Sequence, residues 1–126
     1  MTAVGIVGSA IQNFLTPGMT SSPSALPAGE ADARLHGMGT NTIVVRRSVF
    51  DRIGPFNSAM VPIDDTEWLM RALDAGVGFW HIGEPLVRRR IHDRNLSVDA
   101  RGTPALGALM ARVLHASLVR RRTAGK

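Results

Sequence analysis

The chain has 126 residues, of which 44% are hydrophobic and 20% are charged, and its formal net charge is +5. This size and balance are ordinary for one globular domain or part of one. Because the sequence contains no cysteine, disulfide frameworks, thiolate nucleophiles and cysteine metal sites are excluded. No apolar run approaches the roughly 20 residues of a membrane span, and residues 1–15 lack the basic region of a signal peptide. We therefore expect a cytoplasmic protein without a transmembrane segment.

The charge is unevenly distributed along the chain. Residues 1–87 carry five basic and eight acidic side chains, whereas residues 88–126 carry ten basic and two acidic ones. A basic segment attracts phosphates, anionic lipids or nucleic acid, although a run of charges at a terminus is usually a solvated tail. A nucleic-acid or anionic-surface binder is therefore kept as the weakest functional alternative, and nucleic acid is not the expected partner.

The first half of the chain predicts two strands and a short helix. Apolar and β-branched residues predict a strand over 4–14 and a buried strand over 40–45. Between them, residues 16–36 are rich in Pro, Ser and Gly and predict a flexible loop. Ser48 is a candidate N-cap for a short helix that Gly54 and Pro55 end.

The second half of the sequence predicts a helix, then one or two strands, and then a last helix. A helix is expected over 65–75, with Gly76 at its C-terminus and with Trp68, Leu69, Ala72 and Leu73 as its buried stripe. Residues 78–82 and 86–90 predict a broken strand or a strand pair, with Trp80 in the core. Thr103 and Pro104 open a final helix, whose apolar stripe comprises Leu106, Leu109, Met110, Val113, Leu114 and Leu118. The alternation predicts an α/β fold class.

The acidic cluster Asp64, Asp65 and Glu67 precedes an apolar helix face. A carboxylate held at a helix N-terminus can take the proton of an attacking hydroxyl as a general base. The same residues also suit a purely structural role, because Asp64 and Glu67 have the spacing of a capping box and acids favour the first helical turn. From spacing alone, capping is the favoured interpretation.

The order of features from Gly39 to Ser97 resembles the second half of a family 2 glycosyltransferase with the GT-A fold. Two motifs carry this resemblance: the acidic run Asp64-Asp65-Thr66-Glu67-Trp68, and a stretch with Arg90, His92, Asn95 and Ser97 at the family's Arg-x-His-x-x-Asn-x-Ser spacing. The resemblance implies that Asp65 is the catalytic base, with Asp64 or Glu67 as alternatives. It also implies that His92 approaches a divalent metal, that Arg90 and Arg88 contact phosphate, and that Gly39, Thr40 and Asn41 line the acceptor side. Without the resemblance, His92 is a surface histidine in a basic stretch, and the glycine-containing segment is an ordinary tight turn.

The motif with which GT-A enzymes hold a cation against the donor diphosphate, Asp-x-Asp, does not occur in this sequence. We therefore expect residues 1–102 to form a partial GT-A half-domain with a mixed sheet and flanking helices, and residues 103–126 to form an amphipathic helix and basic tail. The expected function is a glycosyltransferase module that is inactive alone. Its expected partners are a sugar nucleotide, an acceptor, Mn²⁺ or Mg²⁺, and a donor-half polypeptide or a second copy. The alternative is a non-catalytic binding or oligomerisation module, and either would carry an exposed apolar sheet edge or face.

Overall fold

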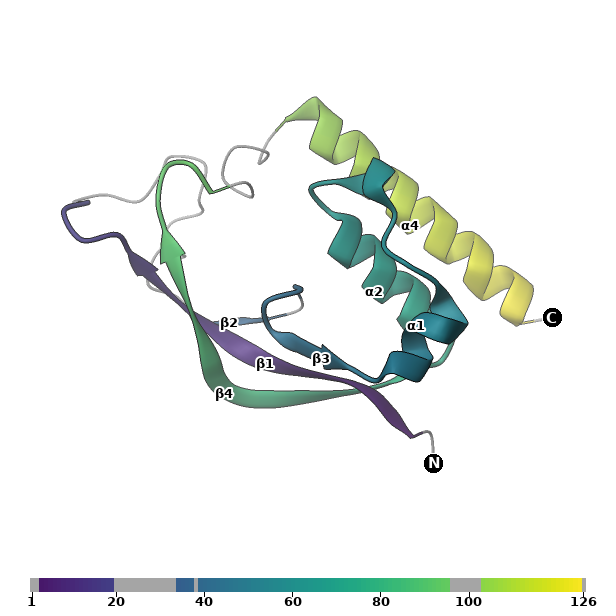
Figure 1. Ribbon diagram of the computed structural model, residues 1–126. Helices are drawn as coiled ribbons and strands as arrows, with labels where there is room; N and C mark the ends of the chain where they lie inside the picture. The colour runs from purple at the N-terminus through teal and green to yellow at the C-terminus, as the bar shows by residue number, and fades with distance from the viewer. Residues whose placement is uncertain (1–2, 20–33, 38, 96–102, 126) are drawn as a thin grey trace.

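The computed structural model describes residues 3–19, 34–37, 39–95 and 103–125. Most of the loop expected over 16–36, the last residues of the Arg-His motif and Lys126 lie outside these ranges. In chain order the elements are β1 (Val4–Leu15), β2 (Arg34–His36), β3 (Ile43–Val45), α1 (Arg47–Ile53), η2 (Ser58–Met60), α2 (Asp64–Asp74), β4 (Gly78–Ile91) and α4 (Pro104–Ala124) (Figure 1). None of the helices within the described ranges is both long enough and apolar enough to cross a membrane.

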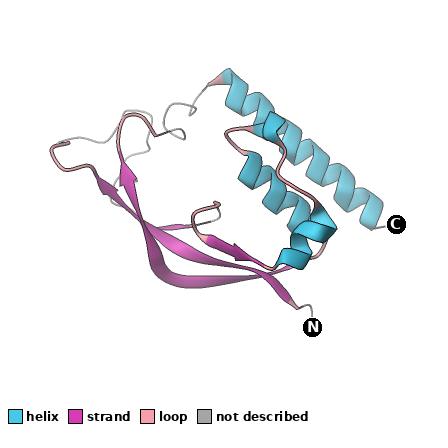
Figure 2. Ribbon diagram, viewed as in Figure 1, coloured by secondary structure: helices cyan, strands magenta, loops and turns pink. Residues whose placement is uncertain are grey.

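The sheet is built around β1. Strand β4 runs parallel to β1 along most of its length, from the pair Val4–Gly78 to the pair Leu15–Ile91. On the other edge of β1, β3 pairs antiparallel with residues 6–8 and β2 pairs antiparallel with residues 10–12. Figure 2 shows this mixed sheet with the helices gathered over one side of it. The expected α/β class, mixed sheet and flanking helices are therefore confirmed.

The break expected within residues 78–90 is a bulge in a single strand. Ser9 pairs with Ile82, but the next residue of β1 pairs with Pro85 and the one after with Val87. The extra residues of β4 lie around Gly83 and Pro85, where proline has no N–H to donate to a ladder. A bulge accommodates extra residues without ending the pairing, so β4 continues to Ile91.

The core lies between the sheet and the helices α1 and α2. Trp68 is fully buried there, stacks on Phe50 with ring centroids 4.7 Å apart, and donates its indole N–H to the carbonyl of Gly54 at 2.8 Å. Gly54 ends α1 with φ +87, a conformation that favours glycine. The predicted buried stripe of α2 is confirmed for Trp68, Leu69 and Ala72.

Helix α4 packs on α2 rather than on the sheet (Figure 1). Its start is as predicted, because Thr103 accepts the Leu106 N–H at 3.2 Å and Pro104 occupies the first turn. The single apolar stripe expected for it is wrong. Val113 is buried, with Leu106 and Leu109 packed beside it, whereas Met110, Leu114 and Leu118 are exposed. At about 100° per residue, Met110, Leu114 and Leu118 lie progressively farther around the helix from Val113, by about 60°, 100° and 140°, so only one side of the stripe can meet α2.

The prediction of a flexible loop over 16–36 and that of a buried strand over 40–45 both need correction. Residues 34–36 form a strand because their backbone pairs with β1. The local sequence gives no indication of this pairing. Residues 40–42 form a turn, closed by the Thr42 N–H donating to the Gly39 carbonyl at 3.0 Å. The remaining strand, β3, is only half-buried, since Val44 is 75% exposed. The expectation that Trp80 lies in the core is also wrong, because this residue of β4 is 64% exposed. Trp80 and Val44 both align with Val7 of β1, and they lie on the side of the sheet that the helices leave uncovered.

The N-caps predicted for α1 and α2 are also wrong. Helix α1 has Arg46, not Ser48, at its N-cap position. The Arg46 N–H donates to the Gly5 carbonyl at 2.9 Å and its guanidinium to the Val4 carbonyl at 2.8 Å, so the end of β3 fixes where α1 begins. Helix α2 begins at Asp64, with Ile63 at the N-cap and no side-chain cap, so the capping box expected from Asp64 and Glu67 is not formed.

Candidate functional site

A cavity of about 510 Å³ opens where the start of α2, the turn 39–42 and the end of β4 meet. Its wall is mixed in character. The polar lining residues include Asp65, Asn41, Thr42, Arg89 and Asn95, and the apolar ones include Ile11, Leu35 and Pro62. Four residues predicted for the site, namely Gly39, Thr40, Asn41 and Asp65, line this one cavity although 24 positions separate Asn41 from Asp65. The structure therefore brings these four together.

Asp65 is the only acidic side chain among the described residues that line the cavity. It lies in the first turn of α2, where the positive end of the helix dipole stabilises a carboxylate. One carboxylate oxygen accepts the N–H of Thr66 at 2.7 Å, and the other accepts the N–H of Thr40 across the cavity at 3.3 Å. These contacts fix the direction of the carboxylate while it remains half-buried and accessible from the cavity.

The turn opposite Asp65 depends on close backbone approach. A Cβ atom added to Gly39 would lie 3.1 Å from the Asp65 carboxylate, and one added to Gly37 would lie 2.6 Å from the Cβ of Thr42. The turn is tied to the central strand, because the Ser9 N–H donates to the Thr42 carbonyl and the Gly37 N–H to the Ser9 carbonyl, at 3.0 and 3.1 Å. Small residues therefore bring the turn backbone within reach of the carboxylate.

The end of β4 contributes a different arginine from those predicted. Arg89 lines the cavity, whereas Arg88 and Arg90 are exposed. The guanidinium of Arg88 lies 4.7 Å from the centroid of the Phe14 ring. Successive side chains of a strand point to opposite faces of the sheet. Arg89 is therefore on the face that borders the cavity, and Arg88 and Arg90 are on the other face. Asn95 was part of the motif without an assigned role, and it also reaches the cavity.

His92 lies beside the cavity in a tight turn. Its N–H donates to the side-chain oxygen of Asn95 at 2.7 Å, and the side-chain amide of Asn95 donates to the Arg90 carbonyl at 3.3 Å. The ring Nδ1 of His92 accepts the Arg94 N–H at 3.1 Å, so a metal ion would have to bind Nε2. Within the described ranges no three His, Asp or Glu side chains gather as metal ligands would. A cation at His92 would therefore need ligands from a bound diphosphate or from residues outside these ranges.

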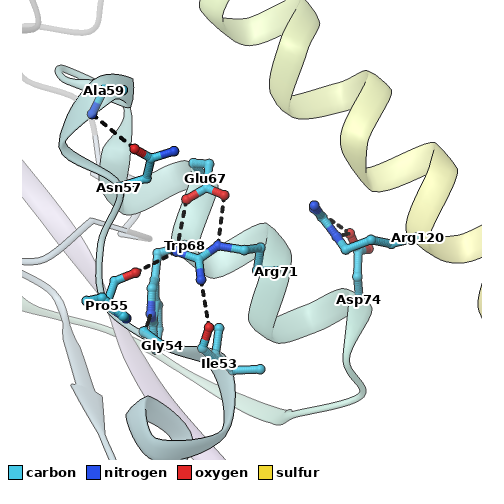
Figure 3. Close-up of polar contacts among 10 residues, drawn as sticks. All are labelled: Ile53, Gly54, Pro55, Asn57, Ala59, Glu67, Trp68, Arg71, Asp74 and Arg120. Carbon is cyan, nitrogen blue, oxygen red and sulfur yellow. Dashed lines mark hydrogen bonds and ion pairs between the residues drawn. The ribbon is translucent and has the colours of Figure 1, made fainter.

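The other two predicted carboxylates do not line the cavity. Glu67 is buried and forms a two-pronged salt bridge with Arg71, at 2.8 and 3.1 Å. Figure 3 shows that the same guanidinium also reaches the carbonyls of Ile53 and Pro55, both at 2.7 Å. This network ties α2 to the end of α1, which gives Glu67 a structural role. Asp64 is half-buried in the first turn of α2.

Compared with protein-family models, with curated proteins and with solved structures, the chain matches none of them. The resemblance to a glycosyltransferase therefore stays a prediction, and the cavity around Asp65 is the main structural indication of function. Sequence reasoning found Asp65 and the turn 39–42, whose signals are local. It missed Arg89, Leu35 and His36, which reach the cavity only through the pairing of β2 and β4 with β1.

Proposed function

We propose that this chain is the acceptor-binding module of a glycosyltransferase, with Asp65 as the general base. The observation that carries the proposal is the half-buried Asp65 carboxylate, which faces a cavity lined by hydroxyl, amide and guanidinium groups. A sugar acceptor presents many hydroxyl groups, and such a wall offers partners for several of them. A carboxylate within hydrogen-bond reach of one hydroxyl can take its proton as that oxygen attacks the anomeric carbon.

The other polar groups take positioning roles in this proposal. Arg89 offers a planar fork of donors to an acceptor hydroxyl or to a phosphate oxygen, and Asn41 and Asn95 each offer both a donor and an acceptor. Gly39 keeps the turn close enough for the Thr40 N–H to orient Asp65. Because Glu67 is committed to Arg71, we assign the base to Asp65 alone.

We propose that the sugar-nucleotide donor binds outside this module. The sequence has no Asp-x-Asp motif, so the sugar nucleotide and its Mn²⁺ or Mg²⁺ ion would be bound mainly by another part of the protein or by another polypeptide. His92 would reach that ion only in the assembled enzyme. We therefore expect the 126-residue chain alone to bind acceptor but not to transfer sugar.

The first test measures acceptor binding to the chain itself. Saturation-transfer NMR against a panel of mono- and oligosaccharides should give a signal with the unchanged protein and a much weaker one with Arg89→Ala. Arg88→Ala is the matched control, because it removes the same charge one residue away on the exposed face. Absence of any saccharide signal, or equal loss in both variants, would contradict the proposal.

The second test measures the base in the assembled enzyme, with UDP- or GDP-sugars and Mn²⁺ as substrates. Asp65→Asn should lower transfer 10²-fold or more, since removing a general base costs about that much. Asp64→Asn is the matched control, because it alters a neighbouring acid outside the cavity and should leave transfer nearly unchanged. If both variants lost transfer activity to a similar extent, the loss would reflect the removal of negative charge from the first turn of α2, and Asp65 would not be a general base.

A second candidate function is a non-catalytic binding or oligomerisation module, and the uncovered sheet face favours it. Val44, Trp80 and Leu86 are 75%, 64% and 64% exposed. Val44 and Trp80 flank Val7 of β1, and Leu86 lines one shallow hollow together with Val44 and Val7. Large exposed apolar side chains so near one another mark an interaction surface more often than single ones do. Sedimentation should show self-association that Trp80→Glu weakens at least tenfold. Leu118→Glu is the control, because it introduces the same charge at an exposed apolar residue of α4, which is 55% exposed. A monomer at all concentrations would exclude self-association through this face.

A further inference from the structure

Two histidines from opposite edges of the sheet meet above its central strand. The Nδ1 of His36, in β2, lies 3.4 Å from the Nε2 of His81, in β4, and the ring centroids are 4.6 Å apart. They are outside any motif that the sequence presents, and 45 positions separate them. They line a small cavity of about 250 Å³, whose other lining residues include Arg34 and Gly83. This cavity adjoins the Asp65 site, because His36 and Leu35 line both cavities, whereas His81 lines only the smaller one.

The central strand makes this meeting possible. His36 pairs with Ala10, and His81 pairs with Gly8, so the two histidines lie on strands separated by β1. Strands two apart in a sheet are about 9.5 Å from each other, and two imidazoles can bridge that gap only if nothing bulky rises between them. Here β1 presents Gly8, Ser9 and Ala10, the shortest run of side chains along its length.

We propose that His36 and His81 chelate one zinc-like divalent metal ion. Two nitrogens bound to Zn²⁺ at 2.0–2.1 Å in tetrahedral geometry lie about 3.3–3.4 Å apart, which matches the separation already present. Both backbones are held by pairing with β1, so binding requires little ordering of the chain. His36 is exposed, and its ring can turn slightly to direct its lone pair at the ion. Water completes the coordination from the cavity.

The chemistry of the cavity selects the class of metal. Imidazole nitrogen suits Zn²⁺, Cu²⁺ and Ni²⁺, whereas Mg²⁺ and Ca²⁺ require several oxygen ligands. Among the described residues that line this cavity, none is acidic. Without metal, one ring donates its N–H to the other. On binding, that ring moves its proton to its other nitrogen, so two neutral imidazoles both present lone pairs and no net proton is released. Protonation at low pH would compete with the metal.

Metal binding would clamp β2 to β4. Strand β2 is three residues long and, among the strands that the structure describes, pairs only with β1, so few hydrogen bonds hold it. A shared ion adds a cross-link between the two edges of the sheet. Because the ion binds the folded arrangement and not the separated histidines, it should raise the melting temperature.

Calorimetric titration of the tag-free chain with ZnCl₂ tests this proposal. We expect binding of one ion per chain, weakened at least tenfold by His36→Ala or His81→Ala and absent in the double variant. His115→Ala, an exposed histidine on α4, should bind Zn²⁺ as the unchanged protein does, and MgCl₂ should give no heat of binding. Binding that survives the double variant, or no binding at all, would overturn the proposal.

A second measurement needs no variant and so cannot be confused by loss of folding. Substoichiometric Cu²⁺ should broaden the ring-proton NMR signals of His36 and His81 first, because the paramagnetic ion acts on the nuclei nearest to it. Earlier broadening of His92 or His115 would place the metal elsewhere and refute the assignment.

Discussion

Asp74 should be the main anchor of α4, and replacing it with asparagine tests this. Its side chain is fully buried, and its two carboxylate oxygens accept from Arg120 at 2.9 Å and from Arg121 at 2.8 Å (Figure 3 shows the contact with Arg120). Breaking a fully buried ion pair costs about 3–5 kcal/mol, and an exposed pair is worth only about 0–1 kcal/mol. The side chains of Arg120 and Arg121 are 33% and 62% exposed, so an intermediate loss of about 2–3 kcal/mol is expected.

The same contact should make the stability of the protein depend on pH. Burial raises the pKa of Asp74, but hydrogen bonds from Arg121, Ser117 and Arg120 together outweigh burial, and the pKa is lowered from its ordinary value of 3.8. The folded state therefore binds this proton less readily than the unfolded state. Its contribution to the free energy of unfolding is complete above the unfolded pKa and is lost as the pH falls through the lowered folded value.

Urea unfolding followed by circular dichroism measures both effects. At pH 7, Asp74→Asn should lower the free energy of unfolding by about 2–3 kcal/mol, or the melting temperature by about 10 °C. The difference from the unchanged protein should hold down to about pH 5 and shrink below about pH 4. Asp51→Asn, on the exposed surface of α1, is the control. If Asp74→Asn costs no more than this control, or if the difference persists undiminished in acid, α4 is held by its apolar contacts instead.

Two further predictions concern the frame of the cavity. Arg71→Ala should cost about 3 kcal/mol in urea unfolding, because it leaves a buried carboxylate and two carbonyls without their partner; a cost below 1 kcal/mol would show that water replaces the guanidinium. Gly37→Ala should cost about 1–3 kcal/mol, since its Cβ would lie 2.6 Å from that of Thr42. Gly107→Ala, inside α4 with nothing within 4 Å, should instead stabilise by up to about 1 kcal/mol, and equal effects of the two alanines would contradict this reasoning.

Elements with a local signal could be predicted from the sequence. Glycine in a left-handed conformation ends α1 at Gly54, and a proline after a capping threonine starts α4 at Pro104. The periodicity around Trp68 likewise identifies the buried face of α2. Each of these features depends on residues only a few positions away in the sequence. It can therefore be predicted without knowledge of the tertiary structure.

Features that depend on distant pairing could not be predicted in the same way. Residues 34–36 become a strand only because β1 offers them an edge, and Arg89 reaches the cavity only because β4 presents that face to α2. The exposure of Val44 follows from which side of the sheet the helices cover. The position of Asp65 opposite the glycine-containing turn was expected only through the resemblance, because spacing alone does not bring the two segments together.

The parallel pairing of β1 with β4 has a consequence for the time course of synthesis. The paired residues are about 75 positions apart, and a ribosome adding about 5–20 residues per second needs about 4–15 s to make that interval. During this delay β1, which contains no charged residue, has no long partner strand, and its apolar edges can pair with another nascent chain. Long-range pairing also slows folding once the chain is complete. The yield of folded protein should therefore depend on chaperones and on the rate of translation between β1 and β4 more than on the stability of the finished sheet.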